Sequence, residues 1–442
     1  MSDGAATPRR VALDALLRIE DGAYAHILVP EVLRRHRFSS RDRAMVTDLV
    51  YGTVRMQRTL DTLLAGVASR PLADLDPDVR SALRLGAFQL LEGFPAHAAV
   101  GETVSVVNAR GRGFVNGVLR GLTRAGPPWK LPTGDDVWSV GVRTSHPDWI
   151  VQVLYDAFGP EDARATLALD NEPPPVTVRV NRLRATPADV AAELAAAGVD
   201  VRPGELVPDA LVLRHAGDLA ALPPLAEGRA TPQDQTSQAI VAALDPQAGE
   251  RILDLASAPG GKATAAAERM GAFGIVVAAD LYPGRVRTVQ RAARRLGLER
   301  TVLPLIADSQ APPVRAAQFD RVLLDAPCSG LGVLRRRPDA RWRLRPEDVR
   351  DLAALQRVLL VAAAAAVKPG GRLVYAVCTL TPEETSEIDA FAAGELPHLT
   401  AVPISAAPWR PLGRGAILLP HDAGTDGMYI LVLRADAVDS QP

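Results

Sequence analysis

Residues 251–262 read Arg-Ile-Leu-Asp-Leu-Ala-Ser-Ala-Pro-Gly-Gly-Lys. An apolar run ends at an acidic residue, a Pro-Gly-Gly turn follows, and the Ala-rich segment 263–270 is typical of a helix. This order predicts a strand, a tight loop and a helix, the first unit of a doubly wound α/β domain. Gly260 and Gly261 lack a Cβ, so a ligand can approach the backbone there. Taken alone, the turn is weak evidence, because ordinary strand-to-helix turns use the same residues.

Aspartates follow the strands that we predict downstream of this turn. Strands are expected at 273–279, 302–307, 319–324 and 371–377. The first strand and the three that follow it end at Asp254, Asp280, Asp308 and Asp325. Because the carboxyl ends of parallel strands line the ligand crevice of these folds, the four carboxylates are expected at one edge of the sheet. An acid at the end of the second strand is suited to accept hydrogen bonds from ribose hydroxyls.

The only two cysteines of the chain stand just past two of these strands. Cys328 closes the run Asp-Ala-Pro-Cys and Cys378 closes the run Tyr-Ala-Val-Cys. Two cysteines in 442 residues make neither a disulfide framework nor a metal-binding spacing, so we expect no metal site. Isolated cysteines are often small buried hydrophobes. If the two strands are neighbours, however, both thiols face the cleft of the Gly turn.

The rest of the chain divides by its periodicity. The N-terminal part has apolar residues at helical spacing throughout, and a Pro- and Gly-rich linker spans 126–134. A helical piece to about residue 171, a strand at 176–180, a helix at 186–197 capped by Thr186 and a short strand at 210–213 follow. We therefore predict a helical domain at 1–130, a small α+β domain at 145–229 and an α/β catalytic domain at 230–437.

Composition is that of a protein with large apolar cores, with a formal net charge of -1 and 48% hydrophobic residues. No run approaches the ~20 apolar residues of a membrane helix. The first ten residues lack the apolar segment of a signal peptide. We expect a cytoplasmic protein without a membrane partner.

Three motifs together resemble the signatures of RNA 5-methylcytosine methyltransferases, and most closely the Sun/RsmB (Fmu) branch, which acts on small-subunit ribosomal RNA. They are Asp254–Lys262, Asp325–Cys328 and Tyr375–Cys378. The segment Asp42–Arg55 resembles the NusB-type helical domain that this branch carries at its N-terminus. Segments 171–181 and 232–238 resemble the stretches that come after that domain in the branch. The resemblance covers nearly the whole chain and implies an all-α NusB-like domain, a small α+β domain and a Rossmann-like methyltransferase domain.

The resemblance also implies roles for single residues. S-adenosylmethionine is the implied cofactor. Its methionine part would be held by the loop residues Ala256, Ser257, Ala258, Pro259, Gly260, Gly261 and Lys262. Asp280 would bind the ribose, with Arg285 nearby, and Asp308 would lie at the adenine. Asp325 would lie between cofactor and target base, Cys378 would be the nucleophile, and Cys328 would assist product release.

The chemistry independently needs such groups. Carbon 5 of cytosine is a poor nucleophile, and addition of a thiolate at carbon 6 makes it enamine-like, which is covalent catalysis. A thiol of ordinary pKa needs activation, and Lys262 is a candidate source of positive potential. Asp325 would have to hydrogen-bond the ring nitrogen in a protonated or shared state. Ala256, Ala263 and Val377 replace the Cys, Thr and Thr that are common in the family, and the mechanism requires none of these groups.

Six arginines lie within residues 335–345, close to Cys328 in the sequence. A charged loop is usually a solvated face, but beside a base pocket we expect phosphate contacts. The candidate RNA-binding residues are Arg335, Arg336, Arg337 and Arg341. Whether Trp342 stacks on a base or packs in a core is left open. The target base must be unstacked to be reached.

The expected partner is small-subunit ribosomal RNA, bound by a monomer. Three alternatives stay open at this point. The substrate could be transfer RNA. The nucleophile could be Cys328, as in DNA cytosine methyltransferases, which use the Cys of a Pro-Cys pair. The chain could also be a non-catalytic RNA-binding or antitermination-type factor.

Overall fold

The computed structural model describes residues 7–214 and 216–437, which fold into two compact units. The first unit comprises the chain up to Pro173 together with the segment Leu334–Arg343, and the second comprises Pro174–Val333 and the chain from Leu344 onward. The chain therefore leaves the second unit after Val333, contributes ten residues to the first, and returns. The units divide the chain inside the segment predicted as the middle domain, and the three-domain boundaries remain a prediction.

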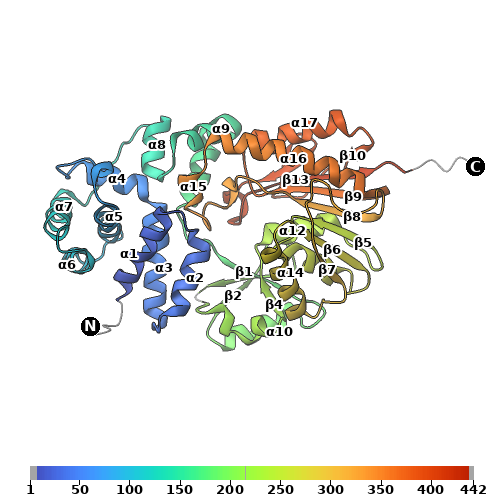
Figure 1. Ribbon diagram of the computed structural model, residues 1–442, viewed down its shortest axis with the longest axis horizontal. Coiled ribbons are helices and arrows are strands. Elements are labelled where there is room, and N and C mark those ends of the chain that lie inside the picture. The colour runs from blue at the N-terminus through green and yellow to red at the C-terminus, as the bar shows by residue number, and fades with distance from the viewer. Residues whose placement is uncertain (1–6, 215, 438–442) are drawn as a thin grey trace, which may run out of the picture. The chain divides into compact units, whose positions relative to one another are not determined.

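The first unit is helical, as predicted for the N-terminal part (Figure 1). Ser39 caps α3, its Oγ accepting from the N–H of Asp42 at 3.1 Å. The α-helices are α1 (Pro8–Glu20), α2 (Ala25–Arg35), α3 (Ser40–Arg55), α4 (Gln57–Ala65), α5 (Pro77–Leu91), α6 (Ala96–Val106), α7 (Arg112–Ala125), α8 (Val137–Thr144), α9 (Asp148–Leu169) and α15 (Ala340–Arg343).

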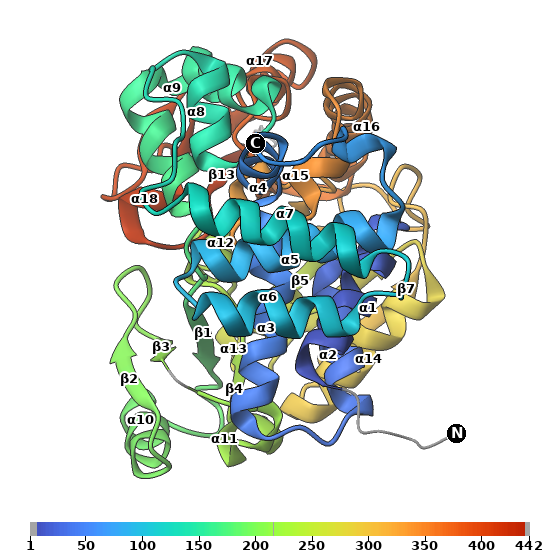
Figure 2. The same ribbon diagram turned by 90° about the vertical axis from the view of Figure 1, so that its left-hand side faces the viewer.

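The core of this unit joins the apolar stripes of its helices, and α5, α6 and α7 lie side by side (Figure 2). Two glycines allow close packing. A Cβ at Gly52 of α3 would lie 2.0 Å from Cζ of Phe88, and one at Gly86 of α5 would lie 2.4 Å from Cδ1 of Leu119. Since real Cβ atoms do not approach so closely, these helices pack as they do because the two positions lack a side chain.

The second unit begins with a small antiparallel sheet of order β2-β3-β1-β4. Its strands are β1 (Val176–Val180), β2 (Asp200–Pro203), β3 (Ala210–Arg214) and β4 (Ala230–Pro232), with α10 (Pro187–Ala196) and α11 (Pro223–Ala226) beside them. Thr186 caps α10, as predicted, by accepting from the N–H of Asp189 at 3.2 Å. The α+β character of this segment is therefore confirmed, although β2 and β4 were not predicted.

The larger sheet of the second unit has the order β11-β12-β13-β9-β8-β5-β6-β7, with β10 paired to β13. Strands β7, β6, β5, β8 and β9 run parallel, and β13 is antiparallel to β9. The strands are β5 (Arg251–Leu255), β6 (Ile275–Asp280), β7 (Val302–Ile306), β8 (Phe319–Asp325), β9 (Val367–Val377), β10 (Leu399–Ala401), β11 (Arg410–Leu412), β12 (Gly415–Leu418) and β13 (Met428–Ala435).

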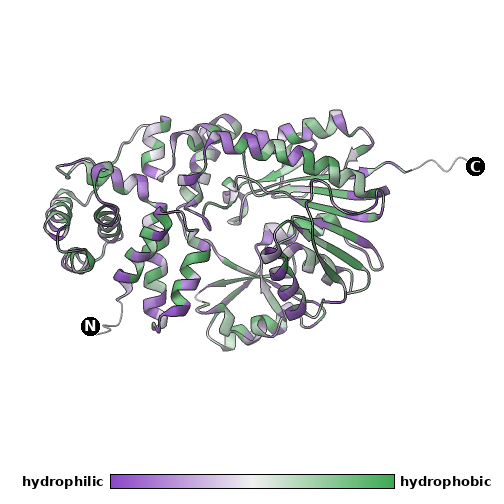
Figure 3. Cartoon of the chain, viewed as in Figure 1, coloured by the Kyte–Doolittle hydropathy of each residue, from purple (hydrophilic) through white to green (hydrophobic). Residues whose placement is uncertain are grey.

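Helix α12 (Gln235–Leu244) leads from the small sheet to β5, and the helices between strands of the larger sheet are α13 (Gly261–Arg269), α14 (Pro283–Leu296), α16 (Pro346–Ala366), α17 (Ser386–Glu395) and α18 (Pro420–Ala423). The central strands are coloured as continuous hydrophobic runs (Figure 3), as expected for parallel strands covered on both faces. The second strand begins at Ile275, two residues later than predicted, because Phe273 lies in an exposed turn. No helix in the described ranges is long and apolar enough to span a membrane.

The strand order positions the site. The chain reverses its direction of winding at β5, which lies between β6 and β8. In open α/β sheets, ligands bind at the carboxyl ends of strands at such a switch point. The loops after β5, β8 and β9 carry the glycines and both cysteines, so the prediction that these strands are neighbours is confirmed.

Candidate active site

The loop after β5 is held in an unusual backbone conformation. Ala256 and Gly260 have positive φ angles of 60° and 99°. A Cβ at Gly260 would lie 3.0 Å from Cα of Val289 on α14, so this position needs both the freedom and the small size of glycine. The N–H of Ser257 donates to the carbonyl of Ala279 at 2.8 Å. The loop is therefore fixed against β6 and α14.

The aspartate that ends β6 organises the next part of the edge. Asp280 is 3% exposed and accepts from the N–H groups of Ala258 at 3.2 Å and Tyr282 at 3.3 Å. Arg285, predicted near the ribose site, pairs with Asp280 at 3.3 Å and donates to the carbonyl of Ala258 at 3.1 Å. Asp308 is exposed after β7, and its Oδ1 accepts from the N–H of Gln310 at 2.9 Å.

Asp254 lies within β5 and is 1% exposed. Its Oδ2 accepts from Ser257 Oγ at 2.8 Å, whereas its Oδ1 has no hydrogen-bond partner among the described residues. Burial raises the pKa of Asp254 to about 7, and the nearby charges of Asp325 and Asp280 add to that effect. The sequence indicated only that Asp254 ends a strand. In the structure, Asp254 is a buried carboxyl group that gains a proton readily.

The two cysteines lie together at the ends of β8 and β9. Their Sγ atoms are 3.3 Å apart, and both residues are partly exposed. Lys262, from the first turn of α13, donates from Nζ to Asp325 Oδ2 at 2.6 Å. Four residues that are up to 116 positions apart in the sequence thus form one cluster, as the strand-end argument predicted.

The charges within this cluster shift the pKa values of Cys328 and Lys262. The hydrogen bond to Cys378, burial and the neighbouring negative charges raise the pKa of Cys328 well above its usual range. Burial would lower the pKa of Lys262, but Asp325 and Cys378 outweigh it, so that the pKa is raised and the ammonium form is retained. Lys262 therefore places a positive charge close to Cys378.

A buried carboxylate joins the two cysteine loops. Glu384 is fully buried and accepts from the N–H of Ser329 at 2.9 Å, from Ser329 Oγ at 2.5 Å, and from Gln356 Nε2 and Thr381 Oγ1 at 2.9 Å each. Ser329 follows Cys328, and Thr381 follows Cys378 by three positions. Our sequence reasoning missed Glu384. In the sequence, Glu384 is distinguished only as an acid six residues after Cys378, and this position does not indicate that its side chain is buried.

Residues 335–343 of the arginine-rich segment belong to the first unit. Arg341 is fully buried and donates to the carbonyl of Ser145 at 3.1 Å and to Asn171 Oδ1 at 3.0 Å. Arg335 is 6% exposed and donates to the carbonyl of Pro173 at 2.9 Å. The expectation of phosphate contact is therefore wrong for these two side chains in this structure, because their guanidinium groups satisfy buried carbonyl groups instead.

The remaining residues of that segment differ. Arg337 is exposed and Arg336 half-buried, so RNA contact by these two residues remains a prediction. Trp342 packs against the core of the first unit, and its Nε1 donates to the carbonyl of Val54 at 2.7 Å. The open question about this indole is thereby answered in favour of packing.

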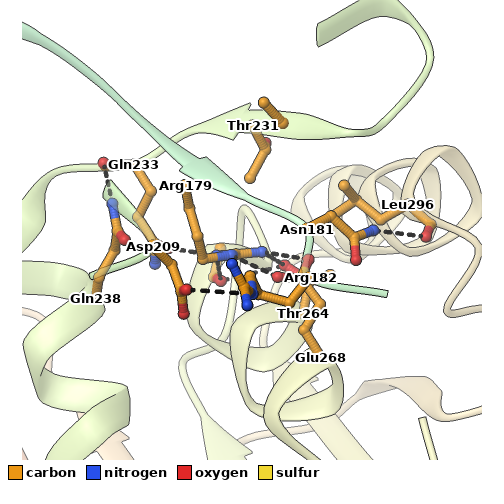
Figure 4. A network of polar contacts seen from close by, with 12 residues as sticks. Arg179, Asn181, Arg182, Asp209, Thr231, Gln233, Gln238, Thr264, Glu268 and Leu296 are labelled. Carbon is orange, nitrogen blue, oxygen red and sulfur yellow. Dashed lines mark hydrogen bonds and ion pairs between the residues drawn. The ribbon is translucent and has the colours of Figure 1, made fainter. Parts of the chain in front are cut away.

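A second buried network ties the small sheet to α13 (Figure 4). Arg179 on β1 forms two hydrogen bonds of 2.9 Å with the carboxylate of Glu268, and its Nη2 donates to Thr264 Oγ1 at 3.1 Å. Its Nη1 donates to the carbonyl of Gly261 at 2.8 Å. A side chain of the small sheet therefore holds the first turn of the helix that carries Lys262.

Comparisons with known proteins agree with this arrangement. Family models match residues 241–434 (16S rRNA methyltransferase RsmB/F), 6–124 (NusB family) and 146–220 (RsmF/B-like ferredoxin-like domain). The chain is 37% identical to "Probable ribosomal RNA small subunit methyltransferase B" of Bacillus subtilis, over 96% of this chain and 98% of the relative. It is 35% identical to "Ribosomal RNA small subunit methyltransferase B" of Pseudomonas putida, over 96% and 97%.

A solved structure covers the same length. The crystal structure of PH0851 matches with a TM-score of 0.84 and 26% identity, over 96% of this chain and 98% of that one. The full-length match to curated relatives and the matched family models confirm the predicted family and fold class. The alternative of a non-catalytic RNA-binding factor is not retained. The chain therefore belongs to the 16S rRNA methyltransferase RsmB/F family and is an S-adenosylmethionine-dependent rRNA methyltransferase with a NusB N-terminal domain and a ferredoxin-like middle domain.

Proposed function

We propose that this enzyme methylates carbon 5 of a cytosine in small-subunit ribosomal RNA, with Cys378 as the nucleophile and Cys328 in product release. The observation that carries the proposal is the pair of sulfur atoms 3.3 Å apart beside the hydrogen-bonded Lys262 and Asp325. We further expect the protein to act in the cytoplasm as a monomer.

The residues at the sheet edge fit S-adenosylmethionine. Asp280 retains acceptor capacity for ribose hydroxyls, because its Oδ1 accepts only the N–H of Tyr282 among the described residues. Within the part of the chain that the structure describes, Asp308 Oδ2 has only a long contact of 3.5 Å to Gln310, which leaves it available to an amino group. The loop Ala256–Lys262 would hold the methionine part. When bound, the cofactor supplies the electrophilic methyl group of a sulfonium.

Cys378 begins the reaction in this proposal. Its thiolate, favoured by Lys262, forms a bond from sulfur to carbon 6 of the base. The electrons of the 5,6 double bond move to the bond between carbons 4 and 5, and those of the bond between carbon 4 and nitrogen 3 move to nitrogen 3, which takes up a proton. Asp325 is the group that would hydrogen-bond ring nitrogen 3, and the ammonium of Lys262, 2.6 Å from Asp325, is the nearby source of a proton. Carbon 5 thereby becomes nucleophilic enough to accept the methyl group.

Cys328 acts after the methyl group has been transferred. Two of the causes that raise its pKa are its hydrogen bond with Cys378 and the charge of Cys378. Both disappear once the Cys378 sulfur is a neutral thioether, so the pKa of Cys328 falls at the stage when the carbon 5 proton must leave. Cys328, after losing its own proton to solvent, would then accept the carbon 5 proton as a thiolate. The electrons of that C–H bond would re-form the 5,6 double bond, and the bond from sulfur to carbon 6 would break with its electrons returning to Cys378 as a thiolate.

Separate replacement of the two cysteines tests these roles. With RNA that contains 5-fluorocytosine, wild-type protein should form a stable covalent complex, C378A should form none, and C328A should retain it. With ordinary RNA, C328A should accumulate an adduct because release fails. Trapping that survives in C378A but is lost in C328A would reverse the assignment. Bisulfite sequencing of ribosomal and transfer RNA, with and without the protein, distinguishes the two substrates.

A further inference from the structure

Helix α14 carries a row of exposed arginines. Arg287, Arg291 and Arg294 all face solvent. At about 3.6 residues per turn, these three positions fall within an arc of about 60°, on the side of the helix away from its buried residues. The rise from the first to the last is about 10 Å. The three positions thus form one line along the helix, which Figures 1 and 2 label α14.

This row is not neutralised by the protein. Helix α14 contains no acidic residue, and within the described ranges none of the three arginines forms an ion pair. Some other surface arginines of the chain have an acid one turn away, such as Arg10 with Asp14 on α1. A solvated helix ordinarily alternates its charges in that way. Helix α7 of the first unit shares this lack of acids, and α14 differs from it in beginning three residues after Asp280.

The positive surface continues at the C-terminal end of the helix. Arg184, from the segment after β1, is exposed, and its Nη1 donates to the carbonyl of Arg295 at 3.3 Å. Arg300 is also exposed just beyond α14. The basic surface therefore extends from the methyltransferase fold to the ferredoxin-like domain within one compact unit.

The helix connects this surface to the site. Its first residue comes three positions after Asp280, so its N-terminal end lies at the carboxyl edge of the sheet, where the cysteine loops also lie. Its C-terminal end lies about 20 Å away toward the opposite edge. A strand of RNA with one base in the site has to leave that edge along some surface of the domain.

We propose that the row Arg287, Arg291 and Arg294 binds the phosphodiester backbone of the RNA that flanks the target cytosine. This inference rests on the proposed function of the site. Guanidinium groups present a planar fork that matches phosphate oxygens, and their charge is complementary to the RNA backbone. Because the row offers no acceptor group and no aromatic ring, the contact is independent of base sequence.

The test compares two matched double variants. R287Q/R291Q removes two charges from the row, whereas R350Q/R357Q removes two from α16, where each arginine is paired with a glutamate. Fluorescence anisotropy measures the affinity for a 16S rRNA transcript and for an unrelated single-stranded RNA at several salt concentrations. We expect R287Q/R291Q to weaken both by about tenfold and to reduce the salt slope by about 1.4 to 1.8, and the control to change neither.

Turnover and cofactor binding complete the test. R287Q/R291Q should raise KM for RNA with kcat unchanged, and calorimetry should give an unchanged affinity for S-adenosylmethionine. Equal RNA affinities and salt slopes for the two double variants would overturn the inference. A loss of S-adenosylmethionine affinity in R287Q/R291Q as large as its loss of RNA affinity would overturn it too. Wild-type binding to phosphatidylserine vesicles that disappears in R287Q/R291Q, with RNA affinity kept, would assign the row to a membrane surface and overturn it too. Wild-type protein that methylates no cytosine would refute the proposed function and leave the binding comparison intact.

Discussion

Replacement of Glu384 should damage both cysteine loops at once. In Glu384→Ala, four donors from Ser329, Gln356 and Thr381 lose their common acceptor in a site without solvent access. A buried donor without a partner costs about 1–3 kcal/mol, and water that enters the space left by the side chain would satisfy some of them. We therefore expect the free energy of unfolding to fall by about 3–5 kcal/mol. In Glu384→Gln, where hydroxyl oxygens can still accept from the new amide, the fall should be about 1–2 kcal/mol.

Activity should fall further than folding alone explains. A displacement of about 1 Å between reacting groups costs about a hundredfold in rate, and the sulfur atoms depend on these loops for their 3.3 Å separation. Single-turnover formation of the adduct with 5-fluorocytosine RNA, at a temperature where each variant is folded, measures this effect. Loss of the Glu384 charge should also lower the pKa of Cys328, since that charge contributes to raising it.

The control is Glu383→Gln, the same chemical change on the adjacent residue, whose side chain forms no hydrogen bond to either loop within the described ranges. Urea unfolding gives the stability of each protein. If Glu384→Ala loses less than about 1 kcal/mol and its adduct forms within about threefold of the wild-type rate, the carboxylate does not hold the loops, and the reasoning is wrong.

Three further predictions concern single charges. Because the pKa of Asp254 is raised to about 7, the folded protein holds the carboxyl proton more tightly than the unfolded chain does, and the free energy of unfolding should fall as pH rises from about 4 to about 7. In Asp254→Asn, the free energy of unfolding, measured in urea at each pH, should change less over this range. The same dependence on pH as in the wild type would contradict the assignment. Lys262→Gln should slow adduct formation by about tenfold or more and move the pH dependence of the rate to higher pH, because the thiolate of Cys378 loses a stabilising cation. Stopped-flow trapping measures both quantities, and a rate and pH dependence equal to those of the wild type would exclude that role. Arg341→Ala should destabilise the first unit by about 3–5 kcal/mol in urea unfolding, since buried carbonyl groups lose their donor, whereas Arg337→Ala on the exposed side should change it by less than about 0.5 kcal/mol.

Local sequence determined the parts of the site that follow one another along the chain. The apolar run before Asp254 and the Gly turn after it predict strand, loop and helix because hydrophobic periodicity and glycine act over a few residues. The strand-end rule then brings Cys328 and Cys378 to one edge, because parallel neighbours share an edge whatever their distance in sequence. Thr186 was a predictable cap for the same local reason.

Only the tertiary structure decided which charged side chains are buried and which face solvent, because burial depends on the segments that pack over a residue. Arg341 and Arg337 lie four positions apart in one basic run, yet one is fully buried among carbonyl groups and the other faces solvent. Glu384 and Arg179 likewise have ordinary sequence surroundings, and most of their partners, such as Gln356, Ser329 and Glu268, lie 28 to 89 positions away. A charge pattern specifies which groups need a partner, whereas the packed chain determines whether water or protein provides it.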